Sequence, residues 1–483
     1  MRLVKSTWVF SYKLDEDGTI AAYKARLVAK GCSQRPCADY TEVFVPTGKQ
    51  ATLRALLTYV AIAGYTMSQG DYSAAFTNGE LEEEILMQQP PHFDDGSGRV
   101  WRLRRALYGL KQAARAWHKV LRRSMGKLGF APFKSDPAVF VRSCSQLPEF
   151  VFTHVDDIIA ATPTDAAHGI IKQLLAEYPG TAQGEPRIML GVLIERDWER
   201  GRISLSQPQL ILALLERHGM AQCAARSTPI AEKAPLPPAA ESKLQPLEQA
   251  EADAFRHIVG SCTHICRTTR PDLSYACSVL AAHYASPSRE VYDQARHMLR
   301  YLRGTQQHRL VLGNLPGSAV ASSVQDLRAC IYADADFANC TDTRRSITGY
   351  VLQLGSAPIA WASRKQSIVT KSTMGAEIMA ASTAIDELPQ VIKLLQDMGI
   401  PSVPTLLRGD NQSAVQSLQS ESEDKRSKYI DIHYHAVRER VGCGDIEMEW
   451  IATSEMKADI LTKALPRVQF EKGRTALGVL PCA

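Results

Sequence analysis

The spacing of hydrophobic and polar positions changes along the chain and divides it into three regions. Up to about residue 225, short runs rich in β-branched and aromatic residues alternate with stretches whose apolar residues recur at helical spacing. Residues 251–310 hold three helical patterns separated by proline. From about residue 326 onward, strand-like runs precede a long helix and a further strand. This order predicts a mixed first region, a helical middle and an α/β end.

A segment between the first two regions has the composition of a surface linker. Residues 227–250 are rich in proline, alanine and charged side chains. We therefore predict three parts: residues 1–226, a linker with a helical connector at 227–325, and an α/β domain at 326–483. The last part has apolar strands and helices of its own, so we expect it to fold independently.

Composition excludes several classes of protein. The 483 residues are 45% hydrophobic and 22% charged, which is typical of globular domains rather than disordered or collagen-like chains. The N-terminus lacks the apolar core of a signal peptide, and no apolar run reaches the roughly 20 residues of a membrane span. The net charge of +5 is too small by itself to indicate a nucleic-acid partner. We expect a soluble, intracellular protein.

The 11 cysteines form no Cys-x-x-Cys pair. The spacing nearest to that of a metal site is Cys262, His264 and Cys266, within a stretch that is predicted to be helical. A zinc site is one interpretation of this triplet. The favoured interpretation is a set of reduced, buried thiols in an intracellular protein.

Three acids of the first region lie where a metal site could form. Asp71 lies at the end of a short run, and Asp156 and Asp157 lie between two β-rich arms. This pattern predicts a β-hairpin with carboxylates at its turn. A solvated turn is the alternative, although such a turn needs no buried arms. A sheet that joins the three acids would suit two Mg²⁺ ions, which prefer hard oxygen ligands and promote nucleotidyl transfer.

Basic side chains are concentrated between Arg99 and Lys127, a stretch without Asp or Glu. Aromatic residues are interleaved with them, and the stretch has no salt-bridge partners of its own. Such a stretch suits a phosphate backbone, the alternative being a solvated amphipathic face. The candidate nucleic-acid-binding residues are Arg104, Arg105, Arg115, Arg122 and Arg123.

Four acids of the α/β end lie at strand ends or on helices. Asp334 ends a strand, Glu377 lies on the long helix, Asp410 follows a strand and Asp459 begins another helix. Such positions can converge on one edge of a sheet, where four carboxylates repel one another unless cations lie among them. Two Mg²⁺ ions would relieve that repulsion and promote phosphodiester hydrolysis. Taken singly, each acid is better explained as a capping or surface residue.

Longer motifs around these acids resemble a known family. The first region is similar, in order and spacing, to the reverse transcriptases of copia-type retrotransposons in YKARLVAKG (23–31), DYSAAFTNGELEEEI (71–85), ALYGLKQAARAW (106–117), SDPAVF (135–140) and HVDDII (154–159). The α/β end resembles the ribonuclease H domain of the same polyproteins in YADADFANCTDTRRSITGY (332–350), STMGAEIMAAS (372–382) and KADILTKAL (457–465). FRHIVGS (255–261) and ARHMLRYLRGT (295–305) resemble the segment that joins them.

The resemblance implies a multidomain α+β and α/β fold: a right-hand polymerase with fingers, palm and a thumb-like segment, a helical connector, and a ribonuclease H-like domain. It implies an RNA-directed DNA polymerase that also hydrolyses RNA in RNA–DNA hybrids. The chain would be a fragment of the polyprotein that lacks the capsid, protease and integrase segments. The implied cofactors are two Mg²⁺ ions per site, with Mn²⁺ as the alternative. The implied partners are an RNA template, a DNA primer, the RNA–DNA hybrid and deoxynucleoside triphosphates. A membrane is not among them. The implied location is a particle in the cytoplasm, or the nucleus.

The resemblance also implies roles for single residues. The metal ligands of the polymerase would be Asp71, Asp156 and Asp157, and those of the ribonuclease H domain Asp334, Glu377, Asp410 and Asp459. Phe76 would lie beneath the sugar and exclude a 2′-hydroxyl, although core packing explains Phe76 alone equally well. Lys24 and Arg26 would grip the triphosphate. Gly109, Lys111 and Gln112 would shape the nucleotide and template pocket.

Several positions depart from the family pattern, among them Tyr72, where valine is usual, and Tyr429, where histidine is usual. Three others bear on the activity. His154 replaces a tyrosine before Val-Asp-Asp, Ala114 replaces a proline, and Gly375 replaces the first glutamate of Glu-Ala-Glu. All seven candidate ligands are intact, which favours an enzyme. The departures keep an alternative open, a catalytically decayed remnant that only binds nucleic acid.

Overall fold

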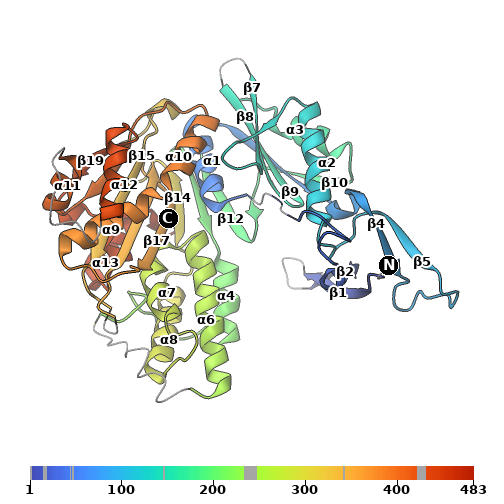
Figure 1. The fold of residues 1–483 in the computed structure, drawn as a ribbon, viewed down its shortest axis with the longest axis horizontal. Helices are drawn as coiled ribbons and strands as arrows, with labels where there is room; N and C mark the ends of the chain where they lie inside the picture. Colours follow the sequence, from blue (N-terminus) through green and yellow to red (C-terminus); the bar gives the residue numbers. More distant parts are fainter. Residues whose placement is uncertain are drawn as a thin grey trace. The chain divides into compact units, whose positions relative to one another are not determined.

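The computed structural model describes residues 3–14, 19–43, 45, 48–144, 147–232, 247–340, 343–420 and 431–482. The chain folds into two compact units (Figure 1). Unit 1 comprises Met1–Lys49 and Tyr65–Pro186, and unit 2 comprises Gln50–Gly64 and Arg187–Ala483. The division into three parts stays a prediction, and residues 233–246 of its linker lie outside the described residues. In the described part of the chain, no helix combines the length and apolarity needed to cross a membrane.

Unit 1 is built on an antiparallel six-stranded sheet with the order β10-β3-β9-β8-β7-β6. Its strands are β3 (Thr66–Tyr72), β6 (Ala131–Pro132), β7 (Val139–Cys144), β8 (Leu147–His154), β9 (Asp157–Thr162) and β10 (Gly180–Gly184). The helices α2 (Ala113–Lys127) and α3 (Ala167–Leu175) cover one face, where Trp117 and Ile170 share a buried cluster with Phe140 and Ile158. Apolar, β-branched and aromatic residues favour these strands because they fit a pleated, buried surface.

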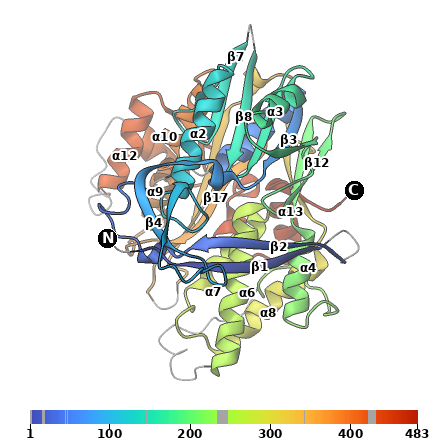
Figure 2. The ribbon, with the colours of Figure 1, turned by 90° about the vertical axis from the view of Figure 1, so that its right-hand side faces the viewer.

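Two antiparallel ribbons complete unit 1. One pairs β1 (Ser6–Leu14) with β2 (Ile20–Ala29), the long blue strands in Figure 2. The other pairs β4 (Glu80–Gln88) with β5 (Val100–Arg105). Short 3₁₀ helices η1 (Gly31–Ser33) and η2 (Ala75–Asn78) follow β2 and β3.

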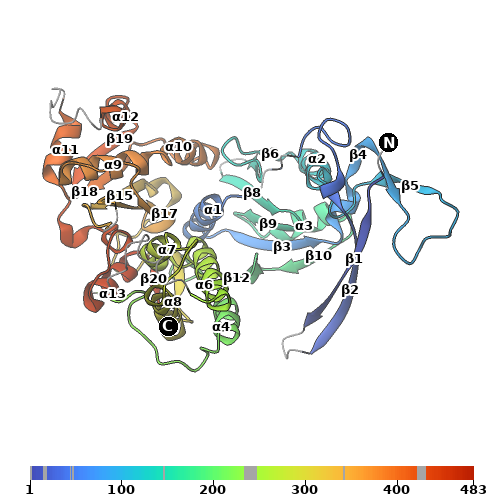
Figure 3. The same cartoon turned by 60° about the horizontal axis from the view of Figure 1, so that its bottom comes forward.

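Unit 2 contains two five-stranded sheets. The antiparallel sheet has the order β11 (Ile188–Met189), β12 (Val192–Asp197), β13 (Arg202–Ser206), β14 (Arg309–Gly313) and β20 (Val479–Leu480). The mixed sheet has the order β17 (Ala357–Lys365), β16 (Ile347–Leu354), β15 (Ala329–Asp336), β18 (Thr405–Gly409) and β19 (Ile446–Trp450). β15, β18 and β19 are parallel, so their carboxyl ends share one edge. Around this sheet lie α9 (Thr373–Ile385), α10 (Leu388–Asp397), α11 (Gln412–Gln419) and α12 (Asp431–Gly442) (Figure 3).

The middle helices of unit 2 share one core with the mixed sheet. They are α4 (Pro208–Arg217), α6 (Gln249–Thr268), η3 (Pro271–Leu273), α7 (Ser274–Ala281) and α8 (Arg289–Gly304), followed near the C-terminus by η7 (Asp459–Leu461) and α13 (Arg467–Ala476). Phe255 and Leu302 of these helices belong to the same buried cluster as Val351 of β16 and Phe470 of α13. β20 also pairs with β14, which follows α8. The predicted connector and α/β domain are therefore packed together.

The helix α1 (Gln50–Ala63) joins this unit although it precedes most of unit 1 in the sequence. Its Arg54 is buried and donates hydrogen bonds to Ile359 O at 2.8 Å and to Arg267 O and Thr268 O at 3.0 Å. The Arg54 guanidinium carbon also lies 4.2 Å from the ring centroid of Trp361. Three carbonyls and an aromatic face thus compensate for a charge that would otherwise be costly to bury.

The shared core predicts that residues 326–483 do not fold alone, contrary to the expectation from composition. Without the middle helices, Val351 and Phe470 would lose the apolar residues that bury them. We expect this fragment to melt without a cooperative transition, while residues 187–483, which retain that core, melt cooperatively. Calorimetry of both fragments tests this. A sharp transition in the shorter fragment would contradict the prediction.

Candidate active sites

The sheet of unit 1 brings together three acids that the sequence singled out. Asp71 of β3 is paired with Asp157 of β9, and Asp156 lies in the turn between β8 and β9. Val155 in that turn has a φ of +57°, a strained conformation for a β-branched residue. Trp117 Nε1 donates to Val155 O at 2.7 Å and fixes the turn. The predicted hairpin with carboxylates at its turn is present.

Burial and mutual repulsion disfavour ionisation of the two hairpin acids. Burial, followed by the charges of Asp71 and Asp157, raises the pKa of Asp156 to about 6. Burial and the charge of Asp71 also raise the pKa of Asp157. The hydrogen bond that Gln69 Nε2 donates to Asp157 Oδ1, at 3.5 Å, acts in the opposite direction and lowers this pKa. A cation would relieve this repulsion because it stabilises the ionised carboxylates.

Phe76, Arg26 and Tyr108 lie near one another, and Arg26 and Tyr108 interact electrostatically with Asp156. Phe76 of η2 packs edge-on against Tyr108 at 5.0 Å between ring centroids. The Arg26 guanidinium carbon lies 6.0 Å from the Tyr108 centroid. Burial and then the charge of Asp156 raise the pKa of Tyr108, so its hydroxyl lies in the field of the acids. Lys24 is exposed and lies on the same face of β2 as Arg26.

Two of the three residues predicted to shape the nucleotide pocket organise loops. Gly109 has a φ of +88°, and a Cβ there would lie 2.1 Å from Ala29 O, so only glycine allows this approach. Gln112 is buried; its Oε1 accepts from Gln34 Nε2 at 2.9 Å, and its Nε2 donates to Asp39 O at 3.0 Å. Lys111 is exposed. Nucleotide binding by these residues stays a prediction.

The basic stretch finds its ion-pair partners in other segments of unit 1. The pairs are Arg99 with Asp95, Arg102 with Glu84, Arg115 with Glu42, Lys119 with Glu82, Arg123 with Glu80, and Lys127 with Glu177. Three of these acids lie on β4. Within the described residues, Arg104, Arg105 and Arg122 form no ion pair, and all three are exposed. The charge available to a ligand is therefore smaller than the composition of the stretch indicates.

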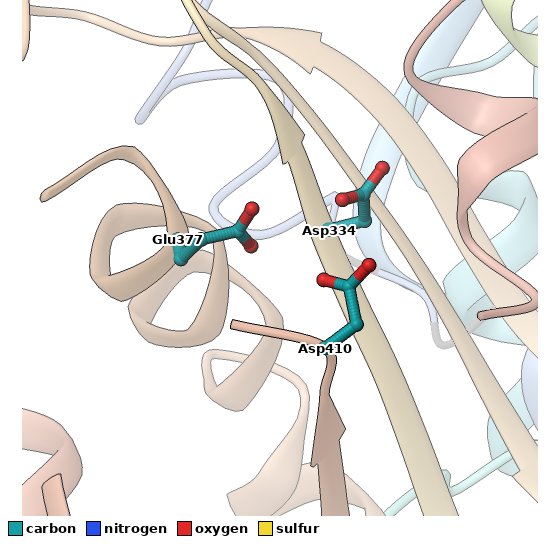
Figure 4. A group of neighbouring side chains, drawn as sticks. All are labelled: Asp334, Glu377 and Asp410. Carbon is teal, nitrogen blue, oxygen red and sulfur yellow. The ribbon is translucent and has the colours of Figure 1, made fainter. Parts of the chain in front are cut away.

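In unit 2, three acids converge at the edge where β15 and β18 end. Asp334 lies near the end of β15, Asp410 directly follows β18, and Glu377 faces them from α9 (Figure 4). One oxygen of each lies within 4.8 Å of the others. Of all the described residues, only these three form such a group, and the acids of unit 1 do not. The donors are all carboxylate oxygens, which fits a hard cation such as Mg²⁺.

Burial dominates the electrostatics of this group. Asp334 is only 4% exposed, and burial, with the charges of Asp459 and Asp410, raises its pKa to about 7. Burial, with the charges of Asp334 and Asp410, raises the pKa of Glu377 well above its ordinary value. Asp459, the fourth predicted ligand, lies outside the group and pairs with Lys463 at 2.8 Å. It begins the short 3₁₀ helix η7 rather than the longer helix predicted from the sequence.

Sequence reasoning overlooked Lys463, Gln69 and Thr462, which contact the acids. Lys463 follows Asp459 by four residues, a spacing that indicates an ion pair on a helical turn and could have identified it. No local pattern marks Gln69, or Thr462, whose Oγ1 donates to Asp334 Oδ2 at 2.6 Å.

Of the three departures that keep the remnant hypothesis open, His154 and Gly375 lie beside candidate ligands. His154 is paired with Asp157 across β8 and β9, and burial lowers the pKa of His154. Ala114 is the second residue of α2, a position where proline and alanine both fit. The Gly375 amide donates to Ser372 Oγ at 3.0 Å in the capped first turn of α9. None of the substitutions removes a candidate metal ligand.

The possible zinc triplet does not converge. Cys262 and Cys266 are buried in the core along α6, whereas His264 is exposed. Among the described residues, these side chains form no group with metal-ligand spacing. The structure favours buried thiols.

Asp334→Asn should stabilise the metal-free protein. The pKa of Asp334 is about 7 in the folded protein and about 4 in the unfolded chain. The protonated carboxyl therefore contributes its full stabilisation below about pH 4, and this stabilisation is lost as the pH rises through about 7. Asparagine avoids this loss because it carries no charge. In EDTA at pH 8 we expect a melting temperature roughly 2–4 °C above that of the unaltered protein, a difference that shrinks towards pH 4. Exposed Asp293→Asn is the control. Equal melting curves at pH 8 would count against the buried-charge account.

Comparison with known proteins identifies relatives of both units. A family model described as "Reverse transcriptase (RNA-dependent DNA polymerase)" matches residues 1–232. The chain is 34% identical over 482 residues to the Retrovirus-related Pol polyprotein from transposon RE2 of Arabidopsis thaliana, covering 99% of this chain and 32% of that protein. It is 32% identical over 494 residues to the corresponding polyprotein from transposon TNT 1-94 of Nicotiana tabacum, covering 99% and 36%. The chain thus spans about a third of the length of these relatives.

A solved structure supports the fold. The foamy viral protease-reverse transcriptase dRH in complex with ds DNA matches with a TM-score of 0.50 at 13% identity, covering 92% of this chain and 65% of that chain. With the mixed sheets and helices of both units, this likeness confirms the predicted fold class, an α+β polymerase with a ribonuclease H-like region. The match to the reverse-transcriptase model and the Pol relatives that span 99% of the chain confirm the predicted family: the chain belongs to the copia-type retrotransposon Pol polyproteins.

Proposed function

We propose that this chain copies RNA and DNA templates into DNA in unit 1 and cleaves the RNA strand of RNA–DNA hybrids in unit 2. The observation that carries the proposal is the pairing of Asp71 with Asp157, with Asp156 at the adjoining turn, in a reverse-transcriptase domain. The separate carboxylate group of unit 2 supports the second activity.

In the proposed polymerase site, Asp71, Asp156 and Asp157 hold two Mg²⁺ ions, or Mn²⁺ in their place. When bound there or in unit 2, such ions supply charge neutralisation and a lowered pKa for the attacking hydroxyl or water. Arg26 offers an exposed guanidinium to the triphosphate of the incoming deoxynucleotide, aided by Lys24. Phe76, held edge-on by Tyr108, presents a fixed ring to the sugar and excludes a 2′-hydroxyl.

In the proposed hydrolytic site, the carboxylates of Asp334, Glu377 and Asp410 bind the ions at the end of two parallel strands. Asp459 joins them once its pairing with Lys463 loosens, because its charge already acts on Asp334. The rigid strands fix two of the ligands, which favours a precise position for the scissile phosphate. The substrate we propose is the RNA strand of the hybrid made in unit 1.

The proposed nucleic-acid contacts of unit 1 are the exposed arginines of β5 and α2. Unpaired guanidinium groups attract phosphates without first losing an ion pair, so Arg104, Arg105 and Arg122 are favoured over Arg115 and Arg123. A decayed remnant that only binds nucleic acid is the competing function. The intact acids of both units argue against it.

Asp156→Asn and Asp410→Asn should separate the two activities. The first should abolish Mg²⁺-dependent primer extension and spare RNA cleavage, and the second should do the reverse, because the acids belong to different units. Extension and hybrid cleavage are measured on the same preparations, with circular dichroism as the control for folding. An unaltered protein that binds hybrids but does neither reaction would establish the remnant instead. Loss of both activities in either folded variant would refute two separate sites.

Replacing both Arg105 and Arg122 by alanine should weaken binding of a duplex primer–template and flatten the slope of log affinity against log salt by about two units, about one for each phosphate contact. Lys119→Ala is the matched control, since Lys119 is already paired with Glu82 at 2.6 Å. Arg104→Ala tests whether the opposite face of β5 also contacts the duplex. An unchanged slope in the double variant would exclude these arginines from the interface.

A further inference from the structure

Thr462 is a fully buried polar residue beside the acids of unit 2. It follows η7 and exposes none of its surface. Its Oγ1 lies 2.6 Å from Asp334 Oδ2 and 3.0 Å from Asp459 O. A hydroxyl has a single proton, and an ionised carboxylate at this shorter distance is the stronger acceptor. Thr462 therefore donates to ionised Asp334.

The position of Thr462 is fixed by a close approach between distant segments. Gly349 of β16 is paired with Asp334 of β15. A Cβ on Gly349 would lie 2.6 Å from Thr462 Cγ2 and 2.9 Å from Leu461 Cβ. Real Cβ atoms do not come so close, so η7 and Thr462 lie directly against β16 only because residue 349 is glycine. This contact places the hydroxyl at Asp334.

The bond to Thr462 matters because Asp334 lies among charges of its own sign. Glu377 and Asp410 repel its carboxylate, and burial deprives it of water. Lys463, the neighbouring cation, is engaged by Asp459 at 2.8 Å. With Oδ2 held by Thr462, the other oxygen remains available as a ligand in a fixed orientation. Hydrogen bonds to ligating carboxylates orient them in this way.

We propose that Thr462 is a positioning residue for RNA cleavage: its hydroxyl holds Asp334 in the orientation that, with Glu377 and Asp410, binds the divalent cation. This inference rests on the proposed activity of unit 2. Thr462 is buried and acts through Asp334, so it does not contact the substrate.

The test compares Thr462→Val with Thr462→Ser in the full chain. Valine keeps the shape and removes the hydroxyl, whereas serine keeps the hydroxyl. Both are made in an Asp156→Asn background, which disables the proposed site of unit 1, and Mn²⁺ binding is measured by electron paramagnetic resonance. We expect valine to weaken Mn²⁺ binding about 10-fold or more, the usual effect of losing a ligand's hydrogen-bond partner, and serine to restore it.

Activity gives a second, independent measurement. With Asp156 restored, Thr462→Val should lower kcat for hybrid cleavage, leave KM unchanged and spare primer extension, because only the geometry of Asp334 changes. Melting curves in EDTA report folding. If the Thr462→Val variant does not fold, Thr462→Ala removes the hydroxyl and leaves a smaller side chain.

Each outcome separates this inference from the proposed function. Unaltered Mn²⁺ affinity in Thr462→Val would overturn the positioning role. A Thr462→Ser variant that binds Mn²⁺ as weakly as Thr462→Val would overturn it too, because packing and not the hydroxyl would then set the affinity. Weakened binding by valine with rescue by serine would support the positioning role. If the unaltered protein then cleaved no hybrid, the proposed function would fail while the role of Thr462 at the cation site stood.

Discussion

Burial of carboxylates that also repel one another is the constraint on which both sites depend. In unit 1, burial and neighbouring acids raise the pKa of Asp156 to about 6, and in unit 2 the same causes raise the pKa of Asp334 to about 7. Such arrangements cost folding free energy in the absence of a counter-ion. The surrounding packing must supply that free energy, and a bound cation returns part of it. Functional sites commonly hold groups with perturbed pKa values for this reason.

The two units meet this constraint with different local devices. In unit 1, a strained turn at Val155 is held by Trp117 of α2, so one aromatic side chain from another element fixes the backbone beneath Asp156. In unit 2, the parallel pairing of β15 and β18 brings Asp334 and Asp410 to one edge, and the approach of η7 to Gly349 adds Thr462. In both, rigid secondary structure carries the acids, which keeps their spacing precise.

In unit 2, segments of different composition share one buried core. The proline-rich segment at 227–250 looks like a border, yet the helices after it share a buried cluster with the mixed sheet. Helix α1 crosses from the N-terminal part of the chain, and buried Arg54 bonds to carbonyls more than 200 residues away in sequence. Composition changes mark exposed segments, but they carry no information about which apolar faces meet.

The sequence by itself determined the strands that carry Asp71 and Asp334, the helix that carries Glu377, the hairpin that carries Asp156 and the family to which the chain belongs. Periodicity, turn chemistry and long motifs act over a few neighbouring residues, so they can be seen without a fold. Only the tertiary structure decided that β4 supplies partners for the cations of α2, that Gln112 and Gly109 organise loops, and that Asp459 lies apart from the group formed by Asp334, Glu377 and Asp410. These outcomes depend on distances between segments far apart in the chain, which side-chain packing sets and local patterns do not encode.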